Sequence, residues 1–568
     1  MYELISDVCA VHAHKEAIVS GAVRLRFGAL LDRARRIAAT LRMRAPGPVV
    51  GFCLPHPEAI VFMLACLDAG KVFVPIDAGT AATVRSGMLR TARCCALVER
   101  LDLDTGELGL TGLDAGAPVH IGALDGVMSI MFTSGSTGQP KGVMVRRASV
   151  CNLLHAPDFL PLDPQDVFAA YSSLSFDAST FEIFTPLLNG NTLVVLDKRD
   201  VLDHAVLQSA IRRERISVMW MTAGLFNTLV LADRWAALAT LRTLLVGGEK
   251  VDPEAARRFV DGARGTALFN GYGPTENTVF TTIAALTPDV MRGVVDEVPL
   301  GRPVRGVQCE IRRAGTSELL DGAGQGRLLV SGAGLAAGYV GETGGTAFAA
   351  HERAVSGRFY DTGDEVRRDA HGIYHFIGRC DAQVKLNGHR VDLGGVERRC
   401  VQAGLAERVH AFHSETMQGL VLVCHAAGVA RDGWRHADAR LDGVLNAWEK
   451  PRRIVFVSDW PLTRNDKTDG RALARRAETL LAEQAEQAEQ AGRDAGSDAL
   501  ARLIARLTRA PATNRQARLF DIGFDSIGIA RLQAEIETQL GVHLDILDIY
   551  EAGSLGGLEE LIRERYAY

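Results

Sequence analysis

The chain has little of what marks a secreted, membrane-spanning or nucleic-acid-binding protein. Its formal net charge is -5 at pH 7, so it has no basic excess that would bind nucleic acid. The N-terminal segment MYELISDVCAVHAHK has no basic start, unlike a signal peptide. The longest apolar stretch, AIVFMLACLDAG, is too short to cross a bilayer. We therefore expect a cytoplasmic protein that binds neither nucleic acid nor membranes.

The cysteines carry no metal or disulfide pattern. The ten cysteines show no paired metal-binding spacing, and Cys94 and Cys95 are adjacent, a separation that rarely bridges. This is typical of inert thiols in a reducing compartment. The remaining composition, 47% hydrophobic and 23% charged, is that of an ordinary globular protein, and 568 residues predict several domains. Because the net charge is slightly negative, an anionic substrate must be held by local groups rather than by an overall positive field.

One segment divides the chain. Residues 478–499 read ETLLAEQAEQAEQAGRDAGSDA, which is a short repeat of Ala, Glu and Gln with few large apolar residues. Such a segment cannot form a core, and it predicts either a solvated helix or a flexible tether. We place a linker at 478–498, with a boundary near 492–498.

Residues 499–568, after the linker, predict a small all-α bundle of four helices. Apolar residues recur in this part at helical spacing. They are Leu500, Leu503, Ile504 and Leu507, then Ile527, Ile529, Leu532, Ile536 and Leu540, and finally Leu558, Leu561 and Ile562.

Before the linker, strand-like runs alternate with helical patterns. Examples are KVFVPID, SIMFTSGS, NTLVVLD, ISVMWMT and LRTLLVGGE. This alternation predicts an α/β fold with strand-to-helix connections. We expect a large multi-layer lobe over 1–380 and a small, mobile α/β lobe over 381–477, with the boundary near Asp381.

The strongest local motif is FTSGSTGQPKG at 132–142. Apolar residues lead into it as a strand, and the loop combines three glycines, four hydroxyls and Lys141. Glycines let backbone N–H groups approach an anion closely, and hydroxyls add donors. The motif is not a Walker loop, because the GxxxxGK[ST] spacing is absent. A flexible polar surface loop is the plain alternative, which this combination directly after a strand disfavours.

Further motifs follow in order along the chain. They are FDAS (176–179), NGYGPTE (270–276), YDTGD (360–364), GRCD (378–381) with QVK (383–385), and PLTRNDK (461–467). In this order they resemble the adenylate-forming superfamily, and specifically the adenylation domains of nonribosomal peptide synthetases. Six ordered motifs are far less easily matched by chance than one. The resemblance covers nearly everything before the linker.

The resemblance implies an ATP site with Mg²⁺. Tyr272 would stack on the adenine, Asn270 would pair with its edge, and Asp364 would accept both ribose hydroxyls. Glu276 would be the metal ligand, because Mg²⁺ takes few carboxylates beside phosphate oxygens. The expected ATP-binding residues are Thr133, Ser134, Gly135, Ser136, Thr137, Gly138, Lys141, Asn270, Gly271, Tyr272, Thr275, Asp364 and Arg379.

Lys467 is the expected catalytic residue. Attack of a carboxylate on the α-phosphate brings two anions together, and a positioned ammonium stabilises the developing charge. The resemblance assigns this role to Lys467. Without the other motifs, Lys467 would be interpreted as a solvated lysine in the turn NDKTDG. The family usually has NGK where this chain has NDK.

Asp381 resembles the hinge at which the small lobe rotates between two half-reactions. Lys385 and Gly388 lie on the loop expected to face a pantetheine tunnel, and the family's ELGE-like run reads DLGG at 392–395.

The last unit carries the signature LFDIGFDS at 519–526, followed by IGIARL. It resembles the acyl and peptidyl carrier motif, which makes Ser526 the attachment point for phosphopantetheine. Asp525 and Ser526 also fit a helix N-terminus, which either residue could simply cap. Peptidyl carriers more often read GGDS, and GFDS also occurs in polyketide-type carriers, so both kinds of downstream system stay open.

A substrate pocket follows from the resemblance residue by residue. Asp177 matches the aspartate that pairs with a substrate α-ammonium, which aryl-acid and fatty-acid ligases usually lack. Lys467 would meet the substrate carboxylate. The other expected pocket residues are Ala178, Phe181, Trp220, Leu245, Gly247, Gly271, Val279 and Phe280. None of these brings a charge or hydroxyl to the substrate side chain, which predicts an apolar amino acid. The set is close to the valine pattern, so we expect L-valine, with isoleucine or 2-aminobutyrate as weaker substrates.

The expected function is therefore that of an amino-acid-activating ligase of secondary metabolism, such as antibiotic biosynthesis. It would form an aminoacyl-AMP and pass the aminoacyl group to phosphopantetheine on Ser526. A phosphopantetheinyl transferase and a condensation or tailoring enzyme acting in trans are the expected partners, because no condensation or thioesterase region fits in the remaining residues. A coenzyme A ligase and an inactive scaffold that only presents a carrier are the alternatives. Asp177 and the fused carrier argue against the first, and the intact site residues argue against the second.

Overall fold

The computed structural model describes most of the chain. The residues outside the description are 114–123, 134–139, 295–296, 343–346, 381–382, 387–388, 415–416, 418, 426–440, 442–443, 462–467, 495–498, 509–514, 518, 520–521, 523, 525, 541, 543, 545 and 567–568. In the described part, no helix is both long and apolar enough to cross a membrane. All ten cysteines are free thiols, as the sequence predicts.

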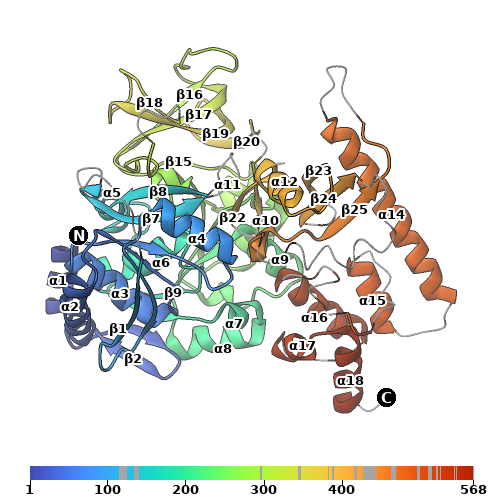
Figure 1. Ribbon diagram of the computed structural model, residues 1–568, viewed down its shortest axis with the longest axis horizontal. Helices are drawn as coiled ribbons and strands as arrows, with labels where there is room; N and C mark the ends of the chain where they lie inside the picture. Colours follow the sequence, from blue (N-terminus) through green and yellow to red (C-terminus); the bar gives the residue numbers. More distant parts are fainter. Residues whose placement is uncertain are drawn as a thin grey trace.

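The large lobe contains a nine-stranded sheet whose inner strands are parallel (Figure 1). In spatial order its strands are β15 (Arg302–Pro303), β14 (Thr282–Ala285), β13 (Ala267–Tyr272), β12 (Thr243–Gly247), β11 (Val218–Thr222), β9 (Val167–Ala170), β10 (Thr192–Val195), β1 (Glu16–Ser20) and β2 (Val23–Arg26). Inner strands such as TLLVG and VMWMT are near-continuous apolar runs, because helices and a second sheet bury both of their faces.

A six-stranded sheet and a smaller antiparallel sheet complete the large lobe. The first is, in spatial order, β6 (Leu108–Gly112), β5 (Ala96–Leu101), β3 (Val49–Phe52), β4 (Val72–Pro75), β7 (Val127–Thr133) and β8 (Lys141–Arg146). The second is β16 (Val307–Arg312), β17 (Gly324–Gly332), β19 (Arg358–Arg368) and β18 (Phe348–Ala350), with β20 (Tyr374–Arg379) paired to β19.

Helices cover these sheets, and one core cluster joins residues of α2, α3 and α6 to both large sheets. The helices are α1 (Tyr2–Val11), α2 (Phe27–Arg44), α3 (His56–Asp68), α4 (Ala82–Thr91), α5 (Arg147–Leu154), α6 (Ala178–Asn189), α7 (Lys198–Leu202), α8 (His204–Glu214), α9 (Ala223–Leu231), α10 (Pro253–Gly262) and α11 (Pro288–Arg292), with short 3₁₀ turns η2 (Leu238–Thr240) and η3 (Thr275–Asn277). Every residue of α6 from Ala178 to Leu188 is buried, which fixes the helix whose N-terminus enters the site.

The small lobe is a separate α/β unit with its own core clusters. Its elements are β21 (Gln383–Leu386), β22 (His389–Asp392), α12 (Leu393–Gln402), β23 (Val409–Ser414), β24 (Gly419–His425), η5 (Ala447–Glu449), β25 (Arg453–Val457) and α14 (Gly470–Asp494). The predicted linker is thus helical through Asp494 rather than a flexible tether. Leu473, Ala477 and Leu481 share one buried face of α14, so the core of this lobe extends past residue 477.

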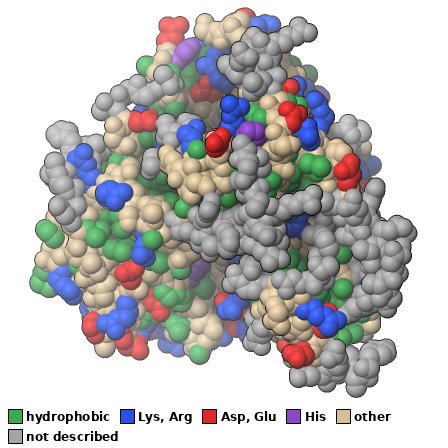
Figure 2. Space-filling model, turned by 45° about the vertical axis from the view of Figure 1, so that its right-hand side comes forward, with side chains coloured by type: hydrophobic (Ala, Val, Ile, Leu, Met, Phe, Trp, Pro, Cys, Tyr) green, Lys and Arg blue, Asp and Glu red, His purple; other side chains and the backbone are tan. Residues whose placement is uncertain are grey.

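The last part is an all-α unit, and the fold class predicted from the sequence is confirmed. Its helices are α15 (Ala499–Thr508), α16 (Ser526–Leu540), α17 (Ile546–Ala552) and α18 (Leu555–Tyr566). In Figure 1 these red helices lie at one end of the molecule, where α16 contacts α7 and α9 and α17 contacts α7. Figure 2 shows acidic and basic side chains interspersed over one face, in keeping with the small net charge.

Candidate functional site

One cavity brings together most of the described residues that the sequence singles out. Thr133, Asp177, Ala178, Trp220, Gly271, Thr275, Val279, Phe280, Asp364 and Arg379 all line it. Some of them stand where parallel strands end, as Thr133 does at the end of β7 and Gly271 does one residue before the end of β13. In open α/β sheets, ligands bind outside the carboxyl ends of the strands. The ordered motifs therefore meet at one place.

The predicted nucleotide residues form a hydrogen-bonded group around Asp364. The Tyr272 hydroxyl donates to the Asp364 carboxylate, and Arg379 forms an ion pair with the same carboxylate. Burial and the adjacent Asp364 raise the pKa of Tyr272 well above its usual value, so the phenol stays protonated. Asn270 donates from Nδ2 to the Pro299 carbonyl at 2.8 Å. Tyr272, Asp364 and Asn270 thus present one polar wall.

Asp177 occupies the N-cap position of α6, but its carboxylate makes no capping bond there. Instead, it accepts a hydrogen bond from Thr275 Oγ1 at 2.6 Å. Burial raises the pKa of Asp177 to about 6, against the lowering effects of the Thr275 hydrogen bond and of the Lys385 charge. This carboxylate would be stabilised by an incoming cation.

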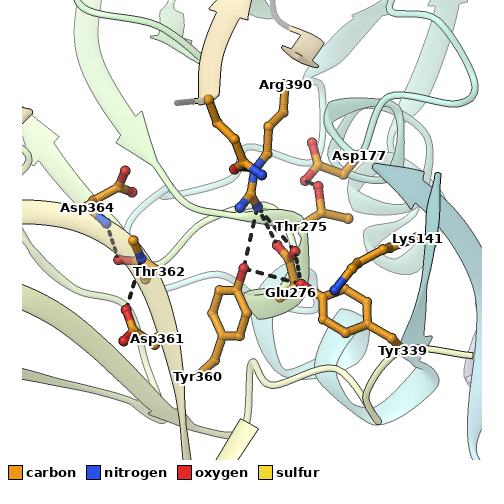
Figure 3. Close-up of polar contacts among 12 residues, drawn as sticks. Lys141, Asp177, Thr275, Glu276, Tyr339, Tyr360, Asp361, Thr362, Asp364 and Arg390 are labelled. Carbon is orange, nitrogen blue, oxygen red and sulfur yellow. Dashed lines mark hydrogen bonds and ion pairs between the residues drawn. The ribbon is translucent and has the colours of Figure 1, made fainter. Parts of the chain in front are cut away.

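A buried ion pair joins the two lobes at the centre of the site (Figure 3). Glu276, on η3, is fully buried, and its carboxylate accepts from Arg390 Nη1 at 3.2 and 3.3 Å and from the Tyr339 hydroxyl at 2.6 Å. Arg390 also reaches the Tyr360 hydroxyl at 3.4 Å. Burial raises the pKa of Glu276, but Arg390 and the tyrosine hydroxyls lower it more, so the net shift is downward and the carboxylate is ionised.

Glu276 has the chemistry expected of a Mg²⁺ ligand, because its carboxylate is ionised and lies in the same site as the predicted nucleotide-binding residues. In the parts of the chain that the structure describes, no group of three or more His, Cys, Asp or Glu side chains could hold a metal ion alone. Mg²⁺ commonly binds through one or two carboxylates together with substrate phosphate oxygens. Arg390 and a metal ion would compete for this carboxylate.

The small lobe contributes Arg390, which the motif analysis did not assign, as well as Lys385 and Asp392, which lie in its motifs. Arg390 stands on β22, and only its closeness in sequence to Lys385 could have pointed to it. The Lys385 ammonium lies 5.9 Å from the centre of the Tyr272 ring. Burial lowers the pKa of Lys385, and Asp364 and Asp177 oppose that effect. Asp392, in the unusual DLGG run, caps α12 by accepting from the Gly395 N–H at 2.8 Å.

Asp77 is a second residue that the sequence did not mark. Its carboxylate accepts from Ser173 Oγ at 2.6 Å and from Ser175 Oγ, and these two hydroxyls lie 3.1 Å apart. The loop with these serines leads directly into Asp177. Asp77 therefore holds the backbone that places Asp177. Only the long-range contact reveals it, because residue 77 lies in no motif.

Aromatic rings close one end of the cavity. Phe280 packs against Phe181 with ring centres 5.4 Å apart and against Trp220 at 5.5 Å. Phe181 and Leu245 are fully buried behind the lining. Two glycines make the close packing possible, since a Cβ on Gly247 would lie 2.0 Å from the Gly271 carbonyl oxygen and one on Gly271 would lie 2.7 Å from the Phe280 ring.

The segment before Phe280 is strained. Thr278 and Val279 have φ of 52° and 62°, a region that β-branched residues rarely adopt. Gly273 permits this turn, because a Cβ there would lie 2.4 Å from the Val279 carbonyl oxygen. Strain of this kind persists where the surroundings over-determine it, commonly at binding sites. Here it places Val279 and Phe280 against the cavity.

A larger cavity leads from this site to the C-terminal unit. Asn270, Tyr272, Asp364 and Lys385 line it at one end, and Phe524, Gly528 and Arg531 line it at the other. Ser526 begins α16, between Phe524 and Gly528 in the sequence. The route fits an extended prosthetic arm attached near the start of α16. The expected tunnel position of Lys385 agrees with this cavity.

Some predicted residues lie outside the described residues. They are Ser134, Gly135, Ser136, Thr137 and Gly138 of the glycine-rich loop, Asp381, which is the expected hinge, Gly388, and Lys467, which is the expected catalytic residue. The two ends of the loop are described. Lys141 pairs with Glu342 at 3.1 Å, and its ammonium lies 4.8 Å from the Tyr339 ring centre (Figure 3).

The contact between Gly247 and Gly271 generates a prediction about stability. Gly247→Ala should destabilise the large lobe by about 1–3 kcal/mol and close the aromatic end of the cavity, because its Cβ meets backbone that cannot yield. Thermal unfolding measures the effect. Gly265→Ala is the matched control, since its Cβ meets nothing within 4 Å and should change stability by no more than about 0.5 kcal/mol. Equal stability of the two variants would contradict this packing.

Comparison with known proteins gives two family matches. Residues 5–340 match the family described as AMP-binding enzyme, and residues 498–562 match the family described as phosphopantetheine attachment site. Malpibaldin synthetase of Mortierella alpina is 30% identical over 96% of this chain, which covers 10% of that relative. Tyrocidine synthase 3 of Brevibacillus parabrevis is 30% identical over 83% of this chain, which covers 8% of that relative.

The chain thus spans only a small part of these curated relatives. A solved structure of similar length is holo-PA1221, described as a nonribosomal peptide synthetase protein containing adenylation and peptidyl carrier domains bound to a vinylsulfonamide inhibitor. It is 29% identical with a TM-score of 0.80, covering 99% of this chain and 96% of its own. The chain therefore belongs to the AMP-binding, adenylate-forming ligases, and it has the adenylation and carrier domains of nonribosomal peptide synthetases.

Proposed function

We propose that this enzyme activates L-valine with ATP as valyl-AMP and transfers the valyl group to phosphopantetheine on Ser526 of its own carrier domain. The observation that carries the proposal is that the buried Asp177 carboxylate lines one cavity together with Asp364 and with the packed rings of Trp220 and Phe280. A free α-amino acid needs a partner for its ammonium and an apolar space for its side chain. This one cavity offers both.

The first step joins the amino acid carboxylate to the α-phosphate. Asp177 binds the ammonium, and Trp220 and Phe280 limit the depth of the pocket to a short branched side chain. Tyr272 and Asp364 hold the nucleoside. The attacking carboxylate and the phosphate are both anionic, so Lys467 binds both and stabilises the charge that develops between them. The carboxylate oxygen bonds to the α-phosphorus, and pyrophosphate leaves.

Phosphopantetheine on Ser526 supplies the thiol for the second step. Residues of the cavity between Phe524 and Tyr272 guide and desolvate the arm. Lys385 and Arg390 place positive charge beside the reacting centre on the small lobe. The lobes divide near Asp381 as the hinge, with a large lobe over 1–380, a small lobe from 381 that includes Leu481 on α14, and a carrier over 499–568.

The proposed partners follow from the chemistry. A phosphopantetheinyl transferase must modify Ser526, and a condensation or tailoring activity would take the loaded amino acid onward in a peptide or related pathway. A coenzyme A ligase would have no use for the fused carrier that the cavity reaches. An inactive scaffold would have no use for an ionised, fully buried Glu276 beside Asp177.

The specificity is tested by amino-acid-dependent pyrophosphate exchange with the full set of protein amino acids and 2-aminobutyrate. Valine should exchange fastest. Isoleucine and 2-aminobutyrate should be about 10–200-fold weaker in kcat/KM, because one methylene in an apolar pocket is worth only about 1–3 kcal/mol. A preference for an aromatic or acidic amino acid would overturn the pocket assignment, and the absence of any exchange would overturn the activity.

The raised pKa of Asp177 predicts a pH dependence. An aspartate whose pKa is raised to about 6 is ionised above that pH and neutral below it. The apparent affinity for the amino acid should therefore be constant above pH 7 and fall about tenfold for each pH unit below 6. The KM for the amino acid between pH 5 and 8 measures this. In Asp177→Asn the KM should be high and flat over the same range, and an unchanged slope in that variant would assign the titration to another group.

Two substitutions should affect the two half-reactions, adenylation and thioester loading, separately. Lys467→Ala should lower exchange by roughly 10²–10³-fold, the cost typical of losing one group that stabilises a developing charge. Ser526→Ala should leave exchange intact and abolish covalent loading, read by intact-protein mass spectrometry after incubation with the transferase, ATP and valine. A valyl mass on the Ser526→Ala chain would show that another residue carries the cargo.

A further inference from the structure

The carrier domain is held by one arginine from each lobe of the adenylation domain. Arg453 lies on β25 of the small lobe, and Arg234 follows α9 of the large lobe. Both reach the carrier, but they contact different kinds of atoms. Figure 1 shows the carrier helices beside α9 at this end of the molecule.

Among the described residues of the carrier, Arg453 donates hydrogen bonds only to backbone carbonyls. It donates from Nη1 to the Ile522 carbonyl at 3.0 Å and from Nη2 to the Thr508 carbonyl. Ile522 lies in the loop that leads into Ser526. Carbonyl groups are present whatever the side chains are, so this contact positions the loop of any carrier with the same backbone.

Arg234 is presented on a rigid turn. After α9, Asp233 adopts φ 56° and its N–H donates to the Val230 carbonyl at 3.1 Å, while the Arg234 N–H donates to the Leu229 carbonyl at 2.8 Å. These are the two hydrogen bonds of a Schellman motif. The next residue, Trp235, packs edge-on against Phe259 with ring centres 5.5 Å apart. The base of the Arg234 side chain is therefore fixed before a carrier arrives.

In the part of the carrier that the structure describes, the polar contacts of Arg234 are all with side chains. Its Nη1 donates to Gln533 Oε1 at 2.9 Å, and its Nη2 pairs with Glu537 at 2.6 Å. Residues 533 and 537 lie one turn apart on the same face of α16, the helix that begins at Ser526. Gln533 Nε2 donates to the Leu544 carbonyl at 2.8 Å, which turns its Oε1 toward Arg234. The guanidinium thus meets one preoriented acceptor, Gln533, and one partly exposed carboxylate, Glu537.

We propose that Arg234 is the residue that selects the carrier for thioester transfer, by pairing with an acidic side chain at position 537 beside an amide at 533. Arg453 supplies a sequence-independent part of the docking. The inference rests on the proposed two-step function and adds a specificity determinant to its second step. An exposed ion pair adds little affinity, but a like charge opposite a mostly buried guanidinium costs much more, so Arg234 acts by rejecting carriers that are basic at this position.

The experiment is a charge exchange across the contact in the full-length holo-protein. The variants are Arg234→Glu, Glu537→Arg and the double variant, with Arg36→Glu on the exposed face of α2 as the matched control. Single-turnover loading with ATP and the amino acid selected by the exchange assay is followed by intact-protein mass spectrometry. Phosphopantetheine occupancy is measured first in each chain, so that loading is expressed per holo-protein.

Each single variant should load at least about tenfold more slowly, while pyrophosphate exchange stays within about twofold of the unsubstituted chain. The double variant should recover to within about threefold, because the pair is restored with reversed polarity. Arg36→Glu should load normally. Normal loading in both single variants, or a double variant no faster than the singles, would overturn the selection proposal alone. Exchange without loading in the unsubstituted holo-protein would overturn the proposed function, and the selection proposal with it.

Discussion

The buried ion pair between Glu276 and Arg390 is the constraint on which the arrangement of the two lobes depends. A fully buried carboxylate without a counter-charge costs several kcal/mol, so Glu276 needs a cation in whatever position the small lobe takes. In this structure the small lobe provides it through Arg390 on β22, and two tyrosine hydroxyls complete the shell. If the small lobe took another position, a metal ion bound with the nucleotide would have to supply the positive charge beside Glu276. The charge of one residue therefore couples what is bound in the large lobe to where the small lobe sits.

The substrate pocket depends on a second constraint, which is packing rather than charge. Trp220 and Phe280 approach each other only because Gly247 and Gly271 leave no Cβ between adjacent strands. The strained backbone at Val279 brings Phe280 into that contact. The result is a rigid apolar end in the same cavity that Asp177 lines, and the proposed amino-acid specificity rests on this arrangement.

Much of the fold and the site could be predicted from sequence, because ordered motifs mark the ends of successive strands. The order of the motifs predicted one shared site, and Asp177, Thr275, Asp364 and Arg379 do line one cavity. The contacts that hold the site could not be predicted in this way. Arg390, Tyr339 and Asp77 act through partners far away in the sequence, and a charged residue outside a motif looks like any solvated side chain. The same holds for α14, where composition suggested a linker but Leu481 completes the core of the small lobe.

The small lobe connects both ends of the reaction path. Its β22 places Arg390 on Glu276 in the nucleotide site, and its β25 places Arg453 on the loop before Ser526. These strands belong to one folded unit, so a rotation of that unit breaks both contacts together. Arg234 remains on the large lobe and keeps its contact with α16 only while the carrier stays docked. In this structure both lobes contact the carrier at the same time, in the same arrangement that pairs Glu276 with Arg390.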